Sequence, residues 1–147
     1  MKRSMWKDQK GVALVVALIM LLVLTLIGMS SISSSYYETK ISGNDRFGTA
    51  AFYAAKGGVD VGINRLPDIS VYGPLPLGDA TYRSGRMTPG SPQPLIYLGA
   101  MARSGYDAMW EFRRFQINAT GQSFGAAKEV EVQVSMGPYP AGTQYNN

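Results

Sequence analysis

The hydrophobic pattern opens with eighteen residues, Val12 to Met29, that contain no charge. At about 1.5 Å per residue a helix of this length extends roughly 27 Å, close to the thickness of a bilayer's hydrocarbon core. Because a backbone in lipid must satisfy its own hydrogen bonds, we predict a membrane-spanning helix. A Ser-rich stretch then ends at Ser35, and Tyr36 and Tyr37 suit a membrane–water interface.

The next segment, Thr39 to Leu66, repeats apolar or small residues with helical spacing. Pro67 is expected to end this helix, because the residue before a proline avoids helical backbone angles. Glycines at Gly43–Asn44 and Gly57–Gly58 predict bends. A continuous helix from Val12 to Leu66 would be roughly 80 Å long. The predicted stripe consists of Ile41, Gly48, Phe52, Ala55, Val59, Ile63 and Leu66.

A β-hairpin is predicted near the C-terminus. Residues 110–120 place aromatic and apolar side chains on alternate positions, with a phase slip at Arg113–Arg114 that indicates a bulge. A turn is expected at residues 121–125. Residues 130–136 alternate Val or Met with Glu, Gln or Ser, which is typical of a half-buried antiparallel strand. Its apolar face is expected to pack on the helix stripe from Phe52 to Leu66.

Residues 67–106 are rich in proline and glycine, which predicts loops with short strands at 80–83 and 95–98. Since an isolated hairpin is only marginally stable, additional strands should come from residues 80–110. Long loops are often functional, so this region is also where we expect a partner-binding surface. The predicted fold class is α+β, with a long N-terminal helix packed on a small antiparallel sheet.

The composition argues against catalysis. The 147 residues include no Cys and no His, which excludes a disulfide framework, a thiolate nucleophile, the commonest zinc ligands and the commonest general base. We therefore predict no catalytic, cofactor-binding or metal site, and we expect the protein not to be an enzyme. The available carboxylates, none with a diagnostic spacing, include Asp60, Asp68, Asp79, Asp107 and Glu111.

The formal charge of +4 belongs mainly to the start of the chain. Four Lys or Arg residues against one Asp give the first ten residues a charge of +3. A positive leader is expected to keep the N-terminus in the cytoplasm and to place the rest of the chain outside it. Arg113 and Arg114 lie among aromatic residues but are expected to be solvated edge residues, so no nucleic-acid partner is expected.

The junction Gln9-Lys10-Gly11-Val12 resembles the class III signal of type IV prepilins, in which a charged leader ends in glycine directly before an apolar helix. In that family a membrane peptidase cuts after the glycine and the new N-terminal residue is N-methylated. The resemblance implies a cut between Gly11 and Val12 that leaves the helix attached. The alternatives are an ordinary signal anchor and a secretory signal peptide, whose apolar region is usually only about 7–15 residues long.

The fifth residue after that cut, Val16, departs from the family. Most pilins carry Glu there. A carboxylate in lipid is costly and is retained for a partner, in this family thought to be the N-terminal amine of a neighbouring subunit. Because Val16 cannot form that ion pair, the sequence favours a minor subunit near the filament tip over a major pilin.

A second stretch resembles the N-terminal region of PilX-type minor pilins. It begins with an acidic residue, followed by a triplet that consists of a small residue, Gly and Asn. A helix rich in small residues comes next and includes Gly57–Gly58. Lys56 stands where the family commonly has an acid. The resemblance extends from about Gln9 to Ile63 and implies a long helix packed on a small antiparallel sheet. The motif residues are Glu38, Ser42, Gly43, Asn44, Asp45 and Arg46.

These patterns divide the chain into five parts. They are a class III prepilin leader (1–11), a transmembrane and filament-core helix (12–35), an amphipathic helix half (36–66), a loop-rich region with the sheet (67–137) and a flexible tail (138–147). We expect a minor pilin that is cut after Gly11, N-methylated at Val12 and assembled at the tip of a type IV pilus, with a role in pilus initiation, biogenesis or cell adhesion. The alternatives are a type II secretion pseudopilin and a signal-anchored periplasmic binding domain that is never assembled.

The expected partners follow from this function. They are other pilins or pseudopilins, the prepilin peptidase, the inner-membrane assembly platform and, before assembly, membrane lipid. We expect the protein in the inner membrane with its C-terminal domain in the periplasm, and after assembly in an extracellular or periplasmic filament.

Overall fold

The computed structural model of the protein describes the backbone of residues 6–143 and the side chains of residues 11–143. The first five residues of the predicted leader and the last four of the predicted tail lie outside this part. The chain divides into two units, one ending at Gly43 and the other beginning at Asn44. Helix α1 (Trp6–Arg65) contributes residues to both units.

In the first unit the described side chains lie on helix α1 alone, and all those from Gly11 to Ser42 are exposed. The helix is long and apolar enough to cross a membrane, with a mean hydropathy of 3.0 in its most apolar window. Three hydroxyl groups in this unit donate to carbonyl oxygens one turn earlier, which gives each an acceptor without water. These bonds are Thr25 Oγ1 to Leu21 O (2.7 Å), Ser33 Oγ to Met29 O (3.0 Å) and Thr39 Oγ1 to Ser35 O (2.9 Å).

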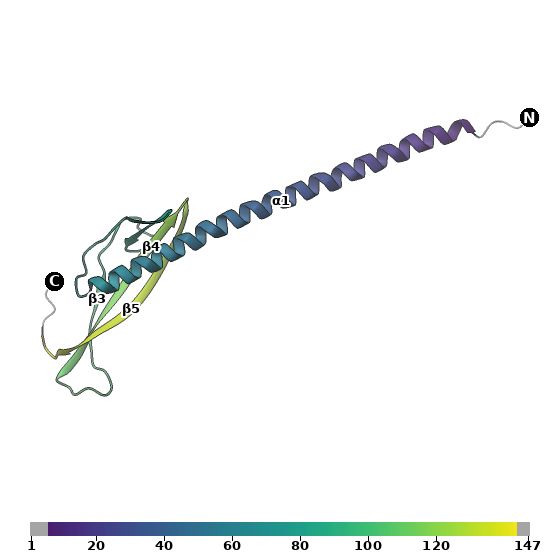
Figure 1. The fold of residues 1–147 in the computed structure, drawn as a ribbon. Coiled ribbons are helices and arrows are strands. Elements are labelled where there is room, and N and C mark those ends of the chain that lie inside the picture. Colours follow the sequence, from purple (N-terminus) through teal and green to yellow (C-terminus); the bar gives the residue numbers. More distant parts are fainter. Residues whose placement is uncertain (1–5, 144–147) are drawn as a thin grey trace, which may run out of the picture. The chain divides into compact units, whose positions relative to one another are not determined.

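The second unit contains a five-stranded antiparallel sheet built around one long hairpin (Figure 1). The central strand β4 pairs along its length with β5, and its other edge pairs with β2 near residues 119–122 and with β3 near residues 112–116. This arrangement confirms the predicted α+β fold. The strands are β1 (Leu75–Leu77), β2 (Ala80–Ser84), β3 (Ile96–Met101), β4 (Trp110–Ser123) and β5 (Ala126–Pro140).

The hairpin is longer than the sequence predicted. Strand β4 continues through Ser123, so the turn is only Phe124–Gly125 and not the whole of residues 121–125. Strand β5 reaches Pro140, which places residues 138–140 of the predicted tail in the sheet. The phase slip predicted at Arg113–Arg114 corresponds to a shift in strand register between Glu111 and Arg113. The short strands predicted at 80–83 and 95–98 correspond to β2 and β3.

The face of α1 that packs on the sheet matches the predicted stripe only in part: Ala55 and Val59 are buried, and Leu66 packs against the core. Phe52 and Ile63 were expected to be covered, but their side chains are 46% and 41% exposed. The buried residues are small, except for one valine, and they recur with helical spacing. They are Ala51, Ala54, Ala55, Gly58, Val59 and Gly62.

Small residues are needed on this face because helix and sheet lie very close together. A Cβ atom on Gly58 would lie 3.0 Å from the Cβ of Ala119, and one on Gly62 would lie 2.7 Å from Cγ2 of Ile117. On the sheet side, a Cβ on Gly121 would collide with the α1 backbone at Ala51 O and Ala55 N. Larger side chains would therefore hold the helix away from β4. The helix continues through Gly57–Gly58, where the sequence suggested a bend.

Tyr72 stabilises the same contact from the loop after the helix. It belongs to the core formed with Val59, Leu95, Ile117 and Ala119. Its hydroxyl donates a hydrogen bond of 2.7 Å to the carbonyl oxygen of Gly58. Burial raises the pKa of Tyr72 to about 12, so the phenol keeps the proton that this bond requires.

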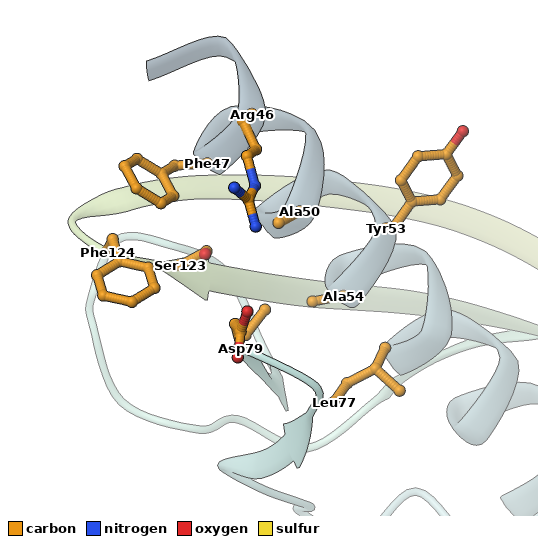
Figure 2. Close-up of a pocket in the computed structure, with 10 residues that line it drawn as sticks. Arg46, Phe47, Ala50, Tyr53, Ala54, Leu77, Asp79, Ser123 and Phe124 are labelled. Carbon is orange, nitrogen blue, oxygen red and sulfur yellow. The ribbon is translucent and has the colours of Figure 1, made fainter. Parts of the chain in front are cut away.

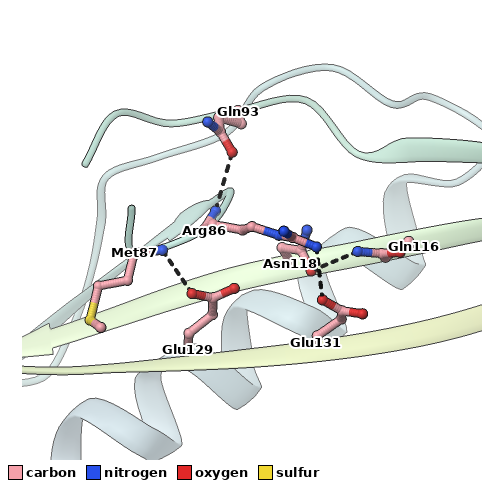
Figure 3. A network of polar contacts seen from close by, with 7 residues as sticks. All are labelled: Arg86, Met87, Gln93, Gln116, Asn118, Glu129 and Glu131. Atoms are coloured by element: carbon pink, nitrogen blue, oxygen red, sulfur yellow. Dashed lines mark hydrogen bonds and ion pairs between the residues drawn. The ribbon is translucent and has the colours of Figure 1, made fainter. Parts of the chain in front are cut away.

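The other face of the sheet is covered by a segment held through polar contacts. The buried Arg83 guanidinium donates to the carbonyl oxygens of Ser91 (2.9 Å) and Arg86 (3.1 Å). Arg86 in turn forms an ion pair of 3.3 Å with Glu131 on β5, beside a hydrogen bond of 2.9 Å from the Met87 N–H to Glu129 (Figure 3). These contacts order part of the loop-rich region that the sequence predicted.

Candidate functional site

The predicted processing residues lie in the first unit on α1. Gly11, Val12 and Val16 are exposed, and apart from its chain neighbours and the adjacent helix backbone no described atom lies within 4 Å of the position a Cβ would take on Gly11. Val16 is 45% exposed within the described structure. This position can thus face lipid or another subunit. The cut after Gly11 and the methylation of Val12 remain predictions.

The motif residues also lie on α1, around the boundary of the two units. The side chains of Glu38, Ser42, Asn44, Asp45 and Arg46 are exposed, and Gly43 is partly buried. Of these six, Arg46 lines a pocket in the second unit, and the other five are not among the residues of that pocket. The structure therefore connects one motif residue to a defined cavity.

The pocket has a volume of about 460 Å³ and is open to solvent. Three parts of the second unit form it: the helix α1, the β1–β2 turn and the tip of the β4–β5 hairpin (Figure 2). Helix residues and the turn supply an apolar floor of Ala50, Ala54, Leu77 and Ala80. The polar side chains in the pocket are Arg46, Tyr53, Asp79 and Ser123.

Three polar groups in this pocket have unused hydrogen-bonding capacity within the described structure. Ser123 is only 3% exposed, yet its hydroxyl has no hydrogen-bond partner among the described residues. Arg46 and Asp79 form neither an ion pair nor a side-chain hydrogen bond in the described part of the chain. Figure 2 shows both charged groups directed into the same space. A donor, an acceptor and a hydroxyl thus converge on one cavity.

The rim of the pocket carries an exposed aromatic residue in a strained conformation. Phe124 has a φ of 43° and is 75% exposed, and its ring lies 4.8 Å from that of Phe47. With Gly125 at φ 87°, the turn has two residues of positive φ, a position pair for which Asn-Gly is strongly preferred. Phenylalanine is costly in the left-handed region, and such strain concentrates at functional sites.

Sequence reasoning identified Arg46 but missed its neighbours. Asp79 was considered only as one of several carboxylates, and Ser123 and Phe124 were assigned to a turn. The available signal was Phe124–Gly125 itself, since a bulky residue at a tight hairpin turn is unusual. The region predicted to bind a partner, residues 67–106, contributes Leu77, Asp79 and Ala80 to the pocket.

Comparison with protein families identifies the N-terminal part of the chain. Residues 10–60 match the family model described as PilX N-terminal. The chain carries a PilX-type N-terminal region. This PilX-type region includes Gly11, Val12, Val16 and the motif from Glu38 to Arg46, and it confirms the resemblance drawn from the sequence. It covers about a third of the chain and contains no strand of the sheet. No curated protein and no solved structure matches the chain.

The PilX-type region indicates a pilin related to type IV pili. Pilins of this family are structural and assemble with other pilins in a filament, so the match points to an assembly function. The apolar N-terminal helix fits membrane anchoring before assembly. Of the pocket residues, Arg46, Phe47, Ala50, Tyr53 and Ala54 belong to the PilX-type region, and the others come from the sheet beyond it.

Proposed function

We propose that the protein is a minor subunit of a type IV pilus that is cut after Gly11, N-methylated at Val12 and assembled near the filament tip. The observation that carries this proposal is the PilX N-terminal match over residues 10–60, which begins one residue before the glycine that precedes the apolar helix. At the tip the subunit takes part in pilus initiation or in adhesion.

The helix of the first unit suits a move from lipid into a filament. Its apolar side chains are exposed from Val12 onward, and the hydroxyls of Thr25, Ser33 and Thr39 donate hydrogen bonds within the helix. Before assembly these side chains contact lipid, with the positive leader in the cytoplasm and the sheet in the periplasm. In the filament they contact the equivalent helices of other pilins. The prepilin peptidase and the inner-membrane assembly platform are the partners that carry out the two steps.

The N-terminal mass of the protein recovered from its native host tests this proposal. We expect a chain that starts at Val12 and carries one additional methyl group. A chain that keeps residues 1–11 indicates a signal-anchored domain outside any filament and contradicts the proposal. Whether the processed subunit cofractionates with type IV pili or with a type II secretion filament then identifies the host system.

The Val16→Glu variant tests the assignment to the tip. A carboxylate at this depth costs at most about 3 kcal/mol of insertion free energy, so the variant should still enter the membrane. It should gain the ion pair with a neighbouring N-terminal amine and appear along the shaft of the filament, as immunogold labelling would show. Val15→Glu, one position away on the helix, serves as the matched control. An unchanged tip location for Val16→Glu would remove Val16 as the reason for that location.

A further inference from the structure

We propose that the pocket between α1 and the hairpin tip, lined by Arg46, Asp79, Ser123 and Phe124, binds an extended polypeptide segment of a partner protein, with one apolar side chain of that segment inserted as an anchor. The proposal concerns recognition by the second unit and does not depend on processing at Gly11. It rests on polar groups without partners, on the apolar floor and on the shape of the cavity.

The polar groups match a peptide unit. A peptide offers a carbonyl acceptor and an N–H donor with no net charge. Arg46 can donate to such a carbonyl and Asp79 can accept from such an N–H, while the buried Ser123 hydroxyl can do either. Because Arg46 and Asp79 bear opposite charges, a ligand with a single charge would be attracted by one and repelled by the other. A neutral ligand with both a donor and an acceptor satisfies the two together.

The residues at the base of the pocket indicate which kind of side chain can be inserted as the anchor. Ala50, Ala54, Leu77 and Ala80 are all small or aliphatic, so the base of the cavity favours an apolar side chain. The paired rings of Phe47 and Phe124 border the cavity, and Phe124 keeps a strained backbone and an exposed ring there (Figure 2). This side chain provides apolar contact area that the fold itself does not use.

The shape favours an extended chain over a compact molecule. A second hollow of about 380 Å³ adjoins the first and shares Asp79, Ser123 and Phe124 with it. It is lined by Thr81 and Gln122, whose side chains can hydrogen-bond a passing backbone. Nearby, β1 stands at the end of the strand order, so its outer edge pairs with no strand in the described part of the chain, and its three residues are exposed. Addition of an extended segment to a sheet edge, with side chains in adjacent pockets, is a common mode of peptide recognition.

Binding can be measured with the full chain in detergent micelles. The probes are fluorescently labelled, terminally blocked hexapeptides that alternate Thr with Ala, Val, Leu or Phe, and a labelled chitooligosaccharide tests the other class of extended ligand. We expect saturable binding of at least one aliphatic peptide, with a Kd on the order of 0.1 mM, and no saturable binding of the oligosaccharide. Failure of every peptide to saturate, or binding of the oligosaccharide alone, overturns the proposal.

Two substitutions at neighbouring positions of α1 test whether the peptide binds in the pocket. Ala50→Phe fills the pocket and should weaken peptide binding by about tenfold or more. Thr49→Phe adds the same side chain at an exposed position outside the pocket and should leave the affinity unchanged. Equal affinities for the two variants would show that the peptide binds elsewhere, including the micelle, and would overturn the proposal.

Ser123→Ala separates a binding role from a structural one. Because the hydroxyl is buried without a partner among the described residues, its removal should keep or raise the unfolding temperature. The same change should weaken peptide binding about threefold or more through the lost hydrogen bond. A lowered unfolding temperature with unchanged affinity would assign Ser123 to stability and contradict its role here. Processing at Gly11 is recorded for every variant, so a failure of the proposed pilin function is seen independently of a failure to bind peptide.

Discussion

Gly121→Ala is expected to destabilise the second unit by about 3 kcal/mol or more, because the added methyl group would occupy the position of the helix backbone. The position that a Cβ would take on Gly121 overlaps Ala51 O and Ala55 N of α1. Backbone atoms cannot rotate away as a flexible side chain can, so the whole helix must move off the sheet. Thermal unfolding of the full chain in detergent, followed by the circular dichroism of the sheet, should show a midpoint lowered by more than about 12 °C.

Gly90→Ala provides the matched control for this result. Gly90 lies in the loop between β2 and β3, outside the left-handed region, and the nearest described atom to its Cβ position is Met87 O at 4.0 Å. This substitution should change the unfolding free energy by less than about 0.5 kcal/mol. If both variants unfold at the wild-type temperature, the close contact between α1 and β4 does not exist in solution.

The elements of this fold could be predicted because their signals are local. An uncharged run of eighteen residues indicates a helix in lipid, and the strict alternation from Val130 to Met136 indicates a half-covered strand. Both depend only on neighbouring residues, and both agree with α1 and β5. The α+β class followed from combining them with the need of a hairpin for further support.

The buried face of the helix was predicted only in part, through Ala55 and Val59. The hydropathy pattern also assigned Phe52 and Ile63 to this face, and both are exposed. The contact depends instead on how closely two backbones approach, which is decided by Gly58 and Gly62 on the helix and Gly121 on the strand. A glycine adds little to a hydropathy pattern, so only the tertiary structure shows that these positions are complementary.

The pocket could not be predicted from the sequence for a related reason. Arg46 stood out through its motif, but its neighbours in space come from separate parts of the sequence, the β1–β2 turn and the tip of the hairpin. Ser123 shows no signal in the sequence, since a serine before a turn is ordinary. Its importance comes from being buried without a partner among the described residues, which is a property of packing alone.

Gly11→Val is expected to abolish processing and, with it, incorporation into filaments. A glycine lets the backbone at the cut approach the peptidase closely, and a branched side chain at that position would obstruct this approach. The intact mass of protein extracted from membranes of the native host should then include residues 1–11, and sheared filaments should contain none of the variant. Insertion into the membrane should continue, because the apolar helix from Val12 onward is unchanged.

Gly28→Val is the matched control for the Gly11→Val experiment. It introduces the same side chain into the same apolar segment, at a second glycine whose Cβ position has no described atom within 4 Å. The variant should be cut and methylated like the wild-type protein, because the change lies away from the Gly11–Val12 bond and adds only apolar surface to an exposed, apolar part of the helix. A cut before Val12 in the Gly11→Val variant would show that processing does not require Gly11, and it would contradict this prediction. A loss of processing in both variants would instead mean that the peptidase responds to the bulk of the apolar helix, so the junction residues would not be the specific signal.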